Sequence, residues 1–502
     1  MLRTIDSLPR PWEAFGVNDI GGTQEGRFYR PVWVLWNFLL GSLPGDSAVV
    51  FHIANVLLLA ASVVLVYALA RRIGMTPGRS WVAAAVFAVY PRHAESVAWI
   101  AGSTDMTSTV LVLGTLVLLL HHDARVLPLA AAVVLAVTAA LAKEAAFALP
   151  FLAMLLAGVS SAGSLRVRRR RVVTALAITV GLAGVFLLRL SVLGEIGGYA
   201  QEGFGPRRLV LVLASQLVAA FTPASLLVLQ HPALLFVPLV LSGSLFGGLL
   251  YLVARRHETT VAPRLRHALI GAGLTLCALG PIANSAIDLN TANGERLLFL
   301  PSVGLAIMVG AVVPGLSRHR SVPLAGLALA VGVGLSLFAS AQYAMAGRLT
   351  DRVVASAVRL APPNSELVML TYPDTYRSAR LLGAGLQEAV WRAGRTDVLV
   401  ATCLPTVVMR KRPVALSIVD SGSGRYDVVT APQLPFDFPV GGGAVTSPGC
   451  TYQPSTGHRL APGLSTFGVA ATTPRRAQQI VVLFDGVDLR VHNESGSGAE
   501  TP

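Results

Sequence analysis

Long apolar stretches separated by short polar gaps dominate the first two thirds of the chain. A helix needs about 20 mainly apolar residues to cross roughly 30 Å of hydrocarbon. This pattern predicts an α-helical polytopic membrane protein with about ten transmembrane helices. The runs lie near 51–71, 80–98, 105–121, 126–142, 144–160, 172–191, 232–254, 265–286, 297–316 and 321–343.

Two further apolar stretches, 31–43 and 208–229, are interrupted by proline or polar residues. Lipid cannot satisfy the backbone polar groups that such interruptions release. We therefore expect these two stretches to form interfacial or re-entrant helices rather than full crossings.

Composition supports the membrane assignment. Of the 502 residues, 53% are hydrophobic and 13% charged, and the mean hydropathy is +0.63, which excludes a soluble globular chain. The formal charge of +14 comes largely from arginines beside apolar runs, where topology explains them better than phosphate binding does. We therefore expect no nucleic-acid partner. The Ala-, Val-, Gly- and Arg-rich usage favours a bacterial plasma membrane.

Basic residues are unevenly divided between alternate loops. Cytoplasmic loops of membrane proteins carry an excess of Lys and Arg, so the richer set is predicted to be cytoplasmic. The opposite loops hold chiefly Arg92, Lys143, Arg207, Arg208 and Arg296. The richer set comprises Arg71, Arg72, Arg79, Arg125, Arg166, Arg168, Arg169, Arg170, Arg171, Arg255, Arg256, Arg264, Arg266, Arg318 and Arg320.

This orientation places both chain ends outside. Residues 1–30 contain no apolar segment that would carry the N-terminus across the membrane. We therefore expect a further helix upstream of Met1; the alternative is a short tail translocated without its own helix.

The gap Tyr90–Asp105 crowds Arg92, His93, Glu95 and Asp105 between two apolar runs. Ionisable groups at this depth are expensive and are usually functional or paired. The alternative is a polar turn, in which Asp105 only caps the helix that follows it. Two further polar segments are predicted at the same outer face: the pair Lys143 and Glu144, and the loop 288–296.

Five segments occur in a fixed order along residues 27–345. They are RFYRP, FHIANVLL, YPRHAESVAWIAGSTD, LAKEAAFALP and ERLLFLPSVG. Together they resemble the polytopic C-type glycosyltransferases, in particular the transmembrane O-mannosyltransferases that carry TPR repeats. Tyr90 stands where that family has its first His, Ser103 or Thr104 where it has an Arg, and Leu298 where it has a Tyr.

The resemblance implies transfer of a sugar from a polyprenyl phosphate carrier to an acceptor outside the cytoplasm. In the family, a carboxylate of the first outer loop accepts the proton of the acceptor hydroxyl, because an alcohol is a poor nucleophile at neutral pH. The acids before residue 30 are Asp6, Glu13, Asp19 and Glu25, and none belongs to a paired acidic motif. We interpret each as a solvated loop charge.

The remaining outer-face residues are assigned roles on this basis. The predicted catalytic residues are Glu95, Asp105 and His93, and the predicted substrate-binding residues are Lys143, Arg296, Arg92 and Arg30. Lys143 and Arg296 would hold the carrier phosphate; the alternative for Lys143 is a snorkelling side chain paired with Glu144. Arg189, inside an apolar run, is a weaker phosphate candidate. No cofactor and no metal site are predicted, since His93 has no further His in ligand spacing.

The last third of the chain differs in composition. Residues 1–344 are predicted to form the transmembrane domain, 345–495 an extracytoplasmic α/β or β-rich accessory domain, and 496–502 a disordered tail. We expect strands at 367–373, 397–409, 413–420, 426–431 and 479–493, a helix from Asp374, and loop over 432–466.

No TPR repeat follows residue 345, so the acceptor, protein or glycan, is undetermined. Cys403 and Cys450 fall in the outer domain, either bonded or as free thiols. The expected partners are the lipid-linked sugar donor and membrane lipids. The alternative function is a non-catalytic relative or a lipid-linked glycan transporter.

Overall fold

The computed structural model describes most of the chain between residues 26 and 491, and the chain divides into two compact units, Met1–Ser340 and Ala341–Pro502. The described residues are 15, 26–121 except 44–47, 126–222 except 160–164, 195–197 and 200–205, 247–313 except 250, 252, 256, 260, 284, 286 and 288–293, 321–402 except 377–378 and 383–384, and the strands named below within 406–491.

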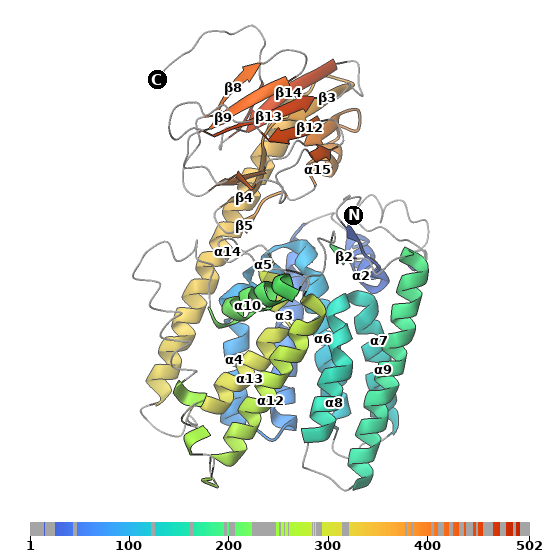
Figure 1. The fold of residues 1–502 in the computed structure, drawn as a ribbon, viewed down its shortest axis with the longest axis vertical. Helices are drawn as coiled ribbons and strands as arrows, with labels where there is room; N and C mark the ends of the chain where they lie inside the picture. Colours follow the sequence, from blue (N-terminus) through green and yellow to red (C-terminus); the bar gives the residue numbers. More distant parts are fainter. Residues whose placement is uncertain are drawn as a thin grey trace. The chain divides into compact units, whose positions relative to one another are not determined.

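The first unit is a bundle of helices (Figure 1). Helices α3, α4, α6, α7, α8, α9, α12 and α13 contribute the residues of one continuous hydrophobic core. The described helices are α2 (Pro31–Gly41), α3 (Ala48–Arg72), α4 (Pro77–Ala88), α5 (Ala94–Ala98), α6 (Ser103–Leu119), α7 (Val126–Ala142), α8 (Leu149–Val159), α9 (Leu165–Leu193), α10 (Pro206–Phe221), α12 (Ala262–Leu279), α13 (Pro301–Val312) and α14 (Ser321–Leu360). The residues of α14 from Ala341 onward belong to the second unit.

Five helical stretches among the described residues are long and apolar enough to cross a membrane: Ala48–Arg72, Ile100–Leu119, Leu165–Leu193, Ala262–Ile282 and Leu329–Leu360. The membrane character is therefore confirmed, but the count of ten spans is not. Several predicted spans form shorter apolar helices, among them Val126–Ala142 and Pro301–Val312. The predicted span 232–254 falls largely outside the described residues.

The predicted span 80–98 is wrong as one helix. Helix α4 ends at Ala88, and the chain continues as the 3₁₀ turn η2 (Pro91–His93) and the five-residue helix α5. Pro91 has no backbone N–H and cannot continue a helix. The interruption creates room for polar side chains between α4 and α6, and a second 3₁₀ turn, η3 (Ile100–Gly102), completes the connection.

Short 3₁₀ turns interrupt the bundle at the same end in two other places. Turn η4 (Glu144–Ala148) joins α7 to α8 after Lys143, whose backbone is extended with φ −161° and ψ 151°. Turns η6 (Gly280–Ile282) and η7 (Glu295–Leu298) lie between α12 and α13. The short strands β1 (Gly26–Arg27) and β2 (Gly198–Tyr199) pair antiparallel, and β1 directly precedes α2 in the sequence.

Close packing of α12 against α13 depends on two glycines. A Cβ at Gly271 would lie 2.6 Å from the carbonyl oxygen of Gly304, and a Cβ at Gly304 would meet the carbonyl oxygen of Gly271 and the hydroxyl of Thr275. Small residues allow such backbone approach between membrane helices, where dispersion and close contacts replace the hydrophobic effect. This pair lets the backbones of α12 and α13 lie close together.

Among its described residues, the second unit contains three sheets, the C-terminal part of α14 and the short helix α15. A four-stranded sheet has the order β15-β14-β3-β6, in which β14, β3 and β6 are parallel and β15 is antiparallel. A five-stranded antiparallel sheet has the order β11-β12-β13-β9-β8, and a four-stranded sheet the order β10-β7-β4-β5. The bounds are β3 (Ser365–Met369), β4 (Tyr372–Tyr376), β5 (Ala379–Arg380), α15 (Leu386–Arg392), β6 (Leu399–Thr402), β7 (Thr406–Met409), β8 (Leu416–Asp420), β9 (Arg425–Thr430), β10 (Phe436–Asp437), β11 (Val445–Ser447), β12 (Cys450–Pro454), β13 (Ser465–Ala471), β14 (Gln478–Phe484) and β15 (Leu489–Val491).

The core of this unit lies between helices and the parallel sheet. Val353 and Ala357 of α14 pack with Leu367 of β3, Val390 of α15 and Phe484 of β14. Strand β3 is buried along its whole length, as expected for a parallel strand covered on both faces.

Two predictions for this unit are wrong. The segment from Asp374 begins as strands β4 and β5, because its aromatic and β-branched residues pair with β7, and the helix α15 starts only at Leu386. Strands β10, β11 and β12 occupy part of the predicted loop 432–466. Cys403, the side chain of Cys450 and the tail 496–502 lie outside the described residues.

Candidate functional site

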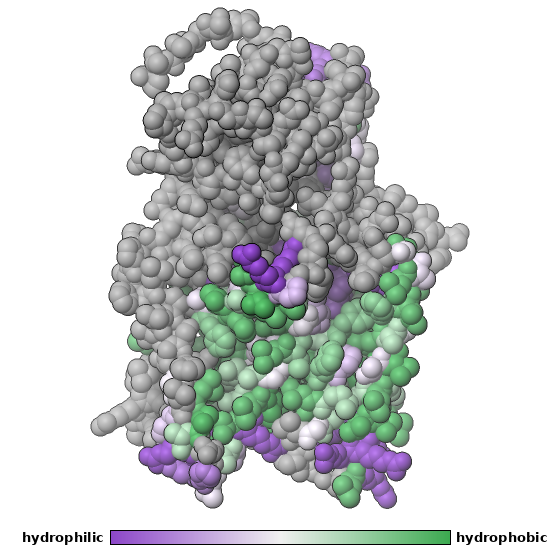
Figure 2. Space-filling model, in the orientation of Figure 1, coloured by the Kyte–Doolittle hydropathy of each residue, from purple (hydrophilic) through white to green (hydrophobic). Residues whose placement is uncertain are grey.

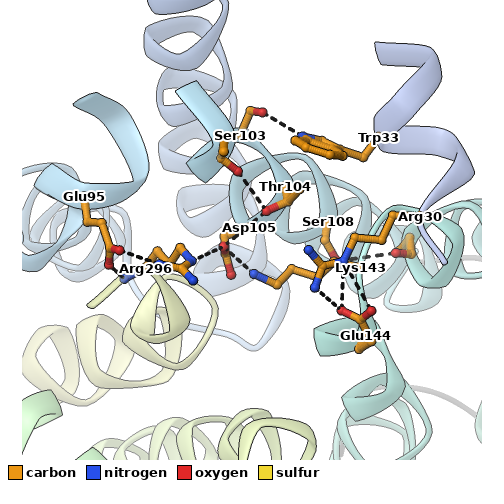
Figure 3. A network of polar contacts seen from close by, with 12 residues as sticks. Arg30, Trp33, Glu95, Ser103, Thr104, Asp105, Ser108, Lys143, Glu144 and Arg296 are labelled. Carbon is orange, nitrogen blue, oxygen red and sulfur yellow. Dashed lines mark hydrogen bonds and ion pairs between the residues drawn. The ribbon is translucent and has the colours of Figure 1, made fainter. Parts of the chain in front are cut away.

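Asp105 lies at the centre of a buried network of charges (Figure 3). Its carboxylate forms an ion pair with Nζ of Lys143 and lies 3.9 Å from Nε of Arg296. The Thr104 hydroxyl donates to the same carboxylate over 3.4 Å. Asp105 therefore connects its own polar segment, Tyr90–Asp105, to the two others, which contribute Lys143 and Arg296. It is paired rather than a simple helix cap, since no side-chain cap is present on α6.

Glu95 and Arg296 form the second part of the network. The Arg296 backbone N–H donates to Oε2 of Glu95 over 2.7 Å, and the guanidinium pairs with Oε1. The same guanidinium lies over the ring of Trp99, 4.7 Å from its centroid. Glu95 is fully buried. Its two oxygens hold both the backbone and the side chain of Arg296, which fixes the direction of the guanidinium.

The carboxylate of Glu144 accepts hydrogen bonds from two arginines that are distant in the chain. Arg30 donates to both carboxylate oxygens, with distances of 2.7–3.2 Å, and Arg189 donates to Oε1 over 2.6 Å. The interpretation of Lys143 as a snorkelling partner of Glu144 is therefore wrong. The extended backbone at Lys143 turns the two neighbouring side chains toward different partners, so Lys143 contacts Asp105 instead.

Arg92 connects α10 to η7. Its Nε donates to the Thr222 carbonyl over 2.6 Å, its Nη2 donates to the Thr222 hydroxyl over 2.9 Å, and its Nη1 pairs with Glu295. Arg92 is almost completely buried. A buried charge of this kind requires full pairing, and the guanidinium fork provides it.

His93 lies among aromatic rings rather than among charges. Its imidazole contacts the rings of Phe87 and Phe299, with centroids 4.6 Å and 4.4 Å away, and its Nε2 lies 2.9 Å from the Ser302 hydroxyl. A buried imidazole among aromatic rings favours its neutral form, because burial disfavours the charge. A neutral ring can orient Ser302 through a hydrogen bond. Among the residues that the structure describes, no group of three or more His, Cys, Asp or Glu could hold a metal ion.

Among the residues that the structure describes, the ion pairs of this network join five basic residues to four acidic ones. Every member is at least largely buried, with Glu144 the most exposed at 23% of its side chain. The bases are Arg30, Arg92, Lys143, Arg189 and Arg296, and the acids are Glu95, Asp105, Glu144 and Glu295.

Sequence reasoning missed several members of this site. Glu295 is adjacent to Arg296, and its charge beside an apolar run was a signal of the same kind. Trp99 lies within the singled-out segment Tyr90–Asp105 but was given no role there. Thr222 carried no signal, because an ordinary threonine acquires importance only through the chain segments that reach it. Trp33 is another, since its Nε1 donates to the Ser103 hydroxyl over 2.9 Å. The first-loop acids Asp6, Glu13, Asp19 and Glu25 lie outside the described residues.

The fold and site together define an integral membrane protein with a buried, cation-rich polar layer at one end of a helical bundle. No protein-family model matches the chain. The chain is 34% identical to the protein O-mannosyl-transferase Tmtc2 of Drosophila melanogaster over 152 residues, which covers 27% of this chain and 16% of that protein. It is also 34% identical to the protein O-mannosyl-transferase TMTC1 of Mus musculus over 111 residues, 21% of this chain and 12% of that protein.

These relatives confirm the resemblance to the transmembrane O-mannosyltransferases over about a quarter of the chain. The chain spans less than a fifth of the length of either relative. Among solved structures, the mycobacterial arabinofuranosyltransferase AftD matches with a TM-score of 0.39 and 16% identity, over 89% of this chain and 37% of that one. The Archaeoglobus fulgidus oligosaccharyltransferase matches with a TM-score of 0.37 and 15% identity, over 80% and 58%.

Proposed function

We propose that this protein is a glycosyltransferase that moves a sugar from a polyprenyl phosphate carrier to an acceptor on the outer side of the membrane. The observation that carries the proposal is the buried layer in which Lys143 and Arg296 meet at Asp105. These residues come from the segments that resemble the O-mannosyltransferases, and basic side chains at the end of a helical bundle attract the phosphate of a lipid.

In this reaction the acceptor hydroxyl oxygen forms a bond to the anomeric carbon while the bond between that carbon and the phosphate oxygen breaks. The bonding electrons leave with the phosphate on the carrier, and a carboxylate accepts the hydroxyl proton. Lys143 and Arg296 stabilise the charge that develops on the departing phosphate. Glu95 holds Arg296 in place for this role.

The network specifies what must change when donor binds. In the described structure Lys143 and Arg296 both face Asp105, so a phosphate competes with that carboxylate for the same cations. A phosphate offers more oxygens and more charge than one carboxylate, and it suits the planar fork of Arg296. Asp105, displaced from Lys143, is then placed as a base or a contact for a sugar hydroxyl.

The remaining predicted residues support this arrangement. Arg30 and Arg92 hold Glu144 and Glu295 respectively, and His93 orients Ser302. In our proposal Arg30 is the substrate-binding candidate that exchanges its carboxylate partner for substrate most readily, because that partner, Glu144, is the most exposed acid of the site. The sugar, and whether the acceptor is a protein or a glycan, are properties that a donor and acceptor screen would define.

One observation favours the second candidate, a non-catalytic relative or lipid-linked glycan transporter. All four acids of the described site pair with cations. A general base must release its partner before it can take a proton. Transfer assays therefore have to separate lipid binding from chemistry.

The test measures binding of undecaprenyl phosphate to the purified full chain in nanodiscs, together with transfer from polyprenyl-phosphate sugars. Lys143→Ala and Arg296→Ala should each lower affinity by about tenfold or more, because a charged hydrogen bond contributes about 1.5–3 kcal/mol. Arg255→Ala is the control: Arg255 is more than half exposed and pairs with Glu258. Unchanged affinity in both variants would exclude the phosphate site, and binding without transfer would support the transporter.

A further inference from the structure

The carbonyl end of α10 is held by two side chains from the interrupted segment after α4. The last carbonyls of a helix have no partner within it. Here the Tyr90 hydroxyl donates to the carbonyl of Ala220 over 2.8 Å and lies 3.4 Å from that of Ala219. Arg92 donates to the carbonyl of Thr222 over 2.6 Å. Both donors are buried, and a cation at this end also complements the helix dipole.

The same arginine reaches η7. One guanidinium nitrogen bonds the Thr222 hydroxyl, another pairs with Glu295, and the side chain is only 1% exposed. The turn begins at Gly294, whose φ of 87° lies in the left-handed region that glycine adopts without strain. The path of the chain into Glu295 and Arg296 is thereby set.

Glu295 and Arg296 are consecutive, so the position of one constrains the other. The Arg296 backbone N–H is bound by Glu95, and its guanidinium faces Asp105. An unbroken series of contacts therefore runs from the end of α10, through Arg92 and Glu295, to the cation that faces Asp105. These contacts join elements separated by about 130 and 200 positions in the chain.

Helix α10 has a second attachment and a free face. The Gln216 amide donates to the carbonyls of Ile282 and Ser285 over 2.6 Å and 2.9 Å. On the opposite side Val210, Leu211 and Val218 are exposed. In Figure 1 α10 lies across the direction of the bundle helices α12 and α13. An apolar stripe on such a helix rests against acyl chains.

We propose that Tyr90 and Arg92 are positioning residues: both hold the end of α10, and Arg92 also ties this end to η7 and thereby fixes the direction of Arg296. Neither residue needs to touch substrate for this role. The coupling to lipid phosphate rests on the proposed function, whereas the tie between α10 and η7 does not. A shift of α10 relative to the membrane would change the direction of the Arg296 guanidinium through this connection.

The first test requires no ligand. A spin label is placed at Val218→Cys in a chain whose native cysteines are replaced by serine, and its mobility is measured in nanodiscs. Arg92→Gln should increase the mobility, and Tyr90→Phe should do so less, because it removes only one donor. Arg264→Gln is the matched control, since Arg264 caps the carbonyls of Ala311 and Val312 at the end of α13. Equal mobility in Arg92→Gln and in wild type would overturn the tie.

The second test measures undecaprenyl phosphate affinity in the same variants. Arg92→Gln should weaken binding by about fivefold or more, the lower range of coupling between sites. Arg264→Gln should leave it unchanged at a similar loss of melting temperature. Arg92→Lys should restore part of the affinity, because it keeps the charge opposite Glu295. Equal losses in Arg92→Gln and Arg264→Gln would overturn the positioning role, whereas failure of the wild type to bind the lipid would overturn the proposed function alone.

Discussion

The two ends of the helical bundle use most of their arginines in opposite ways; Arg171 in the first turns of α9 is an exception, because it is buried. At the end of α3 and the start of α9 the side chains of Arg71, Arg166 and Arg168–Arg170 are exposed, and hydrophilic residues gather at that edge beside apolar helix surface (Figure 2). At the other end Arg92, Arg296 and their neighbours are buried and paired. Arginine count therefore indicates topology at one end, and burial with pairing indicates a site at the other.

The physical difference lies in desolvation. Exposed ion pairs contribute about 0–1 kcal/mol, because water and salt screen them. Removing one partner of a buried pair costs about 3–5 kcal/mol, since it leaves a charge without compensation. The same substitution should therefore have very different consequences at the two ends.

The largest effect is expected for Lys143→Ala. It leaves the buried carboxylate of Asp105 without its ammonium partner, so the free energy of unfolding should fall by about 3–5 kcal/mol. Chemical denaturation of the full chain measures it. Adding Asp105→Asn should recover a large part of the loss, because the buried charge is then removed as well. A double variant no more stable than Lys143→Ala would contradict the pairing.

Glu95→Gln should affect sugar transfer more than folding, because the buried guanidinium of Arg296 keeps the carboxylate of Asp105, 3.9 Å away, as a second partner. The amide oxygen can still accept the Arg296 N–H, but the charge that holds the guanidinium is lost. Charged hydrogen bonds contribute about 1.5–3 kcal/mol, so transfer should fall about tenfold or more. Expression should remain, and the paired variant Asp105→Asn should cost mainly stability. Wild-type turnover in Glu95→Gln would make this loop a structural turn.

Exposed arginines at the opposite end should tolerate change. Arg169→Cys should alter stability by no more than about 0.5 kcal/mol, as surface substitutions do. The same variant tests orientation, since an impermeant maleimide should not label it in intact cells but should label Gly457→Cys. The reverse pattern would invert the predicted topology and place the site on the cytoplasmic side.

The smallest effect concerns an ion pair in the second unit. Hydrogen bonds from Arg395, and from the Asn364 backbone N–H, lower the pKa of Asp397 to about 2. A depressed pKa contributes stability above the unfolded value near 4, and this stability is lost as pH falls toward 2. In Asp397→Asn the melting temperature should therefore depend less on pH between pH 4 and 2 than it does in the wild type. A slope equal to that of wild type would show that Asp397 is not linked to folding.

The sequence alone predicted much of the site. It identified the membrane character, the polar segment Tyr90–Asp105, and Lys143 and Arg296 as residues of one face, because charge in an apolar context is costly wherever it occurs. The structure brings these residues into contact. Their roles in transfer stay predictions.

The sequence did not predict which residues pair with which. Lys143 and Glu144 are neighbours, yet they pair with different elements, and Arg92 holds the end of α10 about 130 positions away. In the second unit the segment from Asp374 had the pattern of a helix start but pairs as a strand, because β7 offers open backbone groups beside it.

Hydropathy and residue type thus determined that the chain has membrane character and which charges require explanation, because transfer from water to lipid depends on each side chain locally. The choice of partner for every buried charge was decided only by the tertiary structure. Pairing depends on distances between atoms from separate helices, and a close approach such as that of Gly271 and Gly304 sets those distances. Local sequence does not contain that geometry.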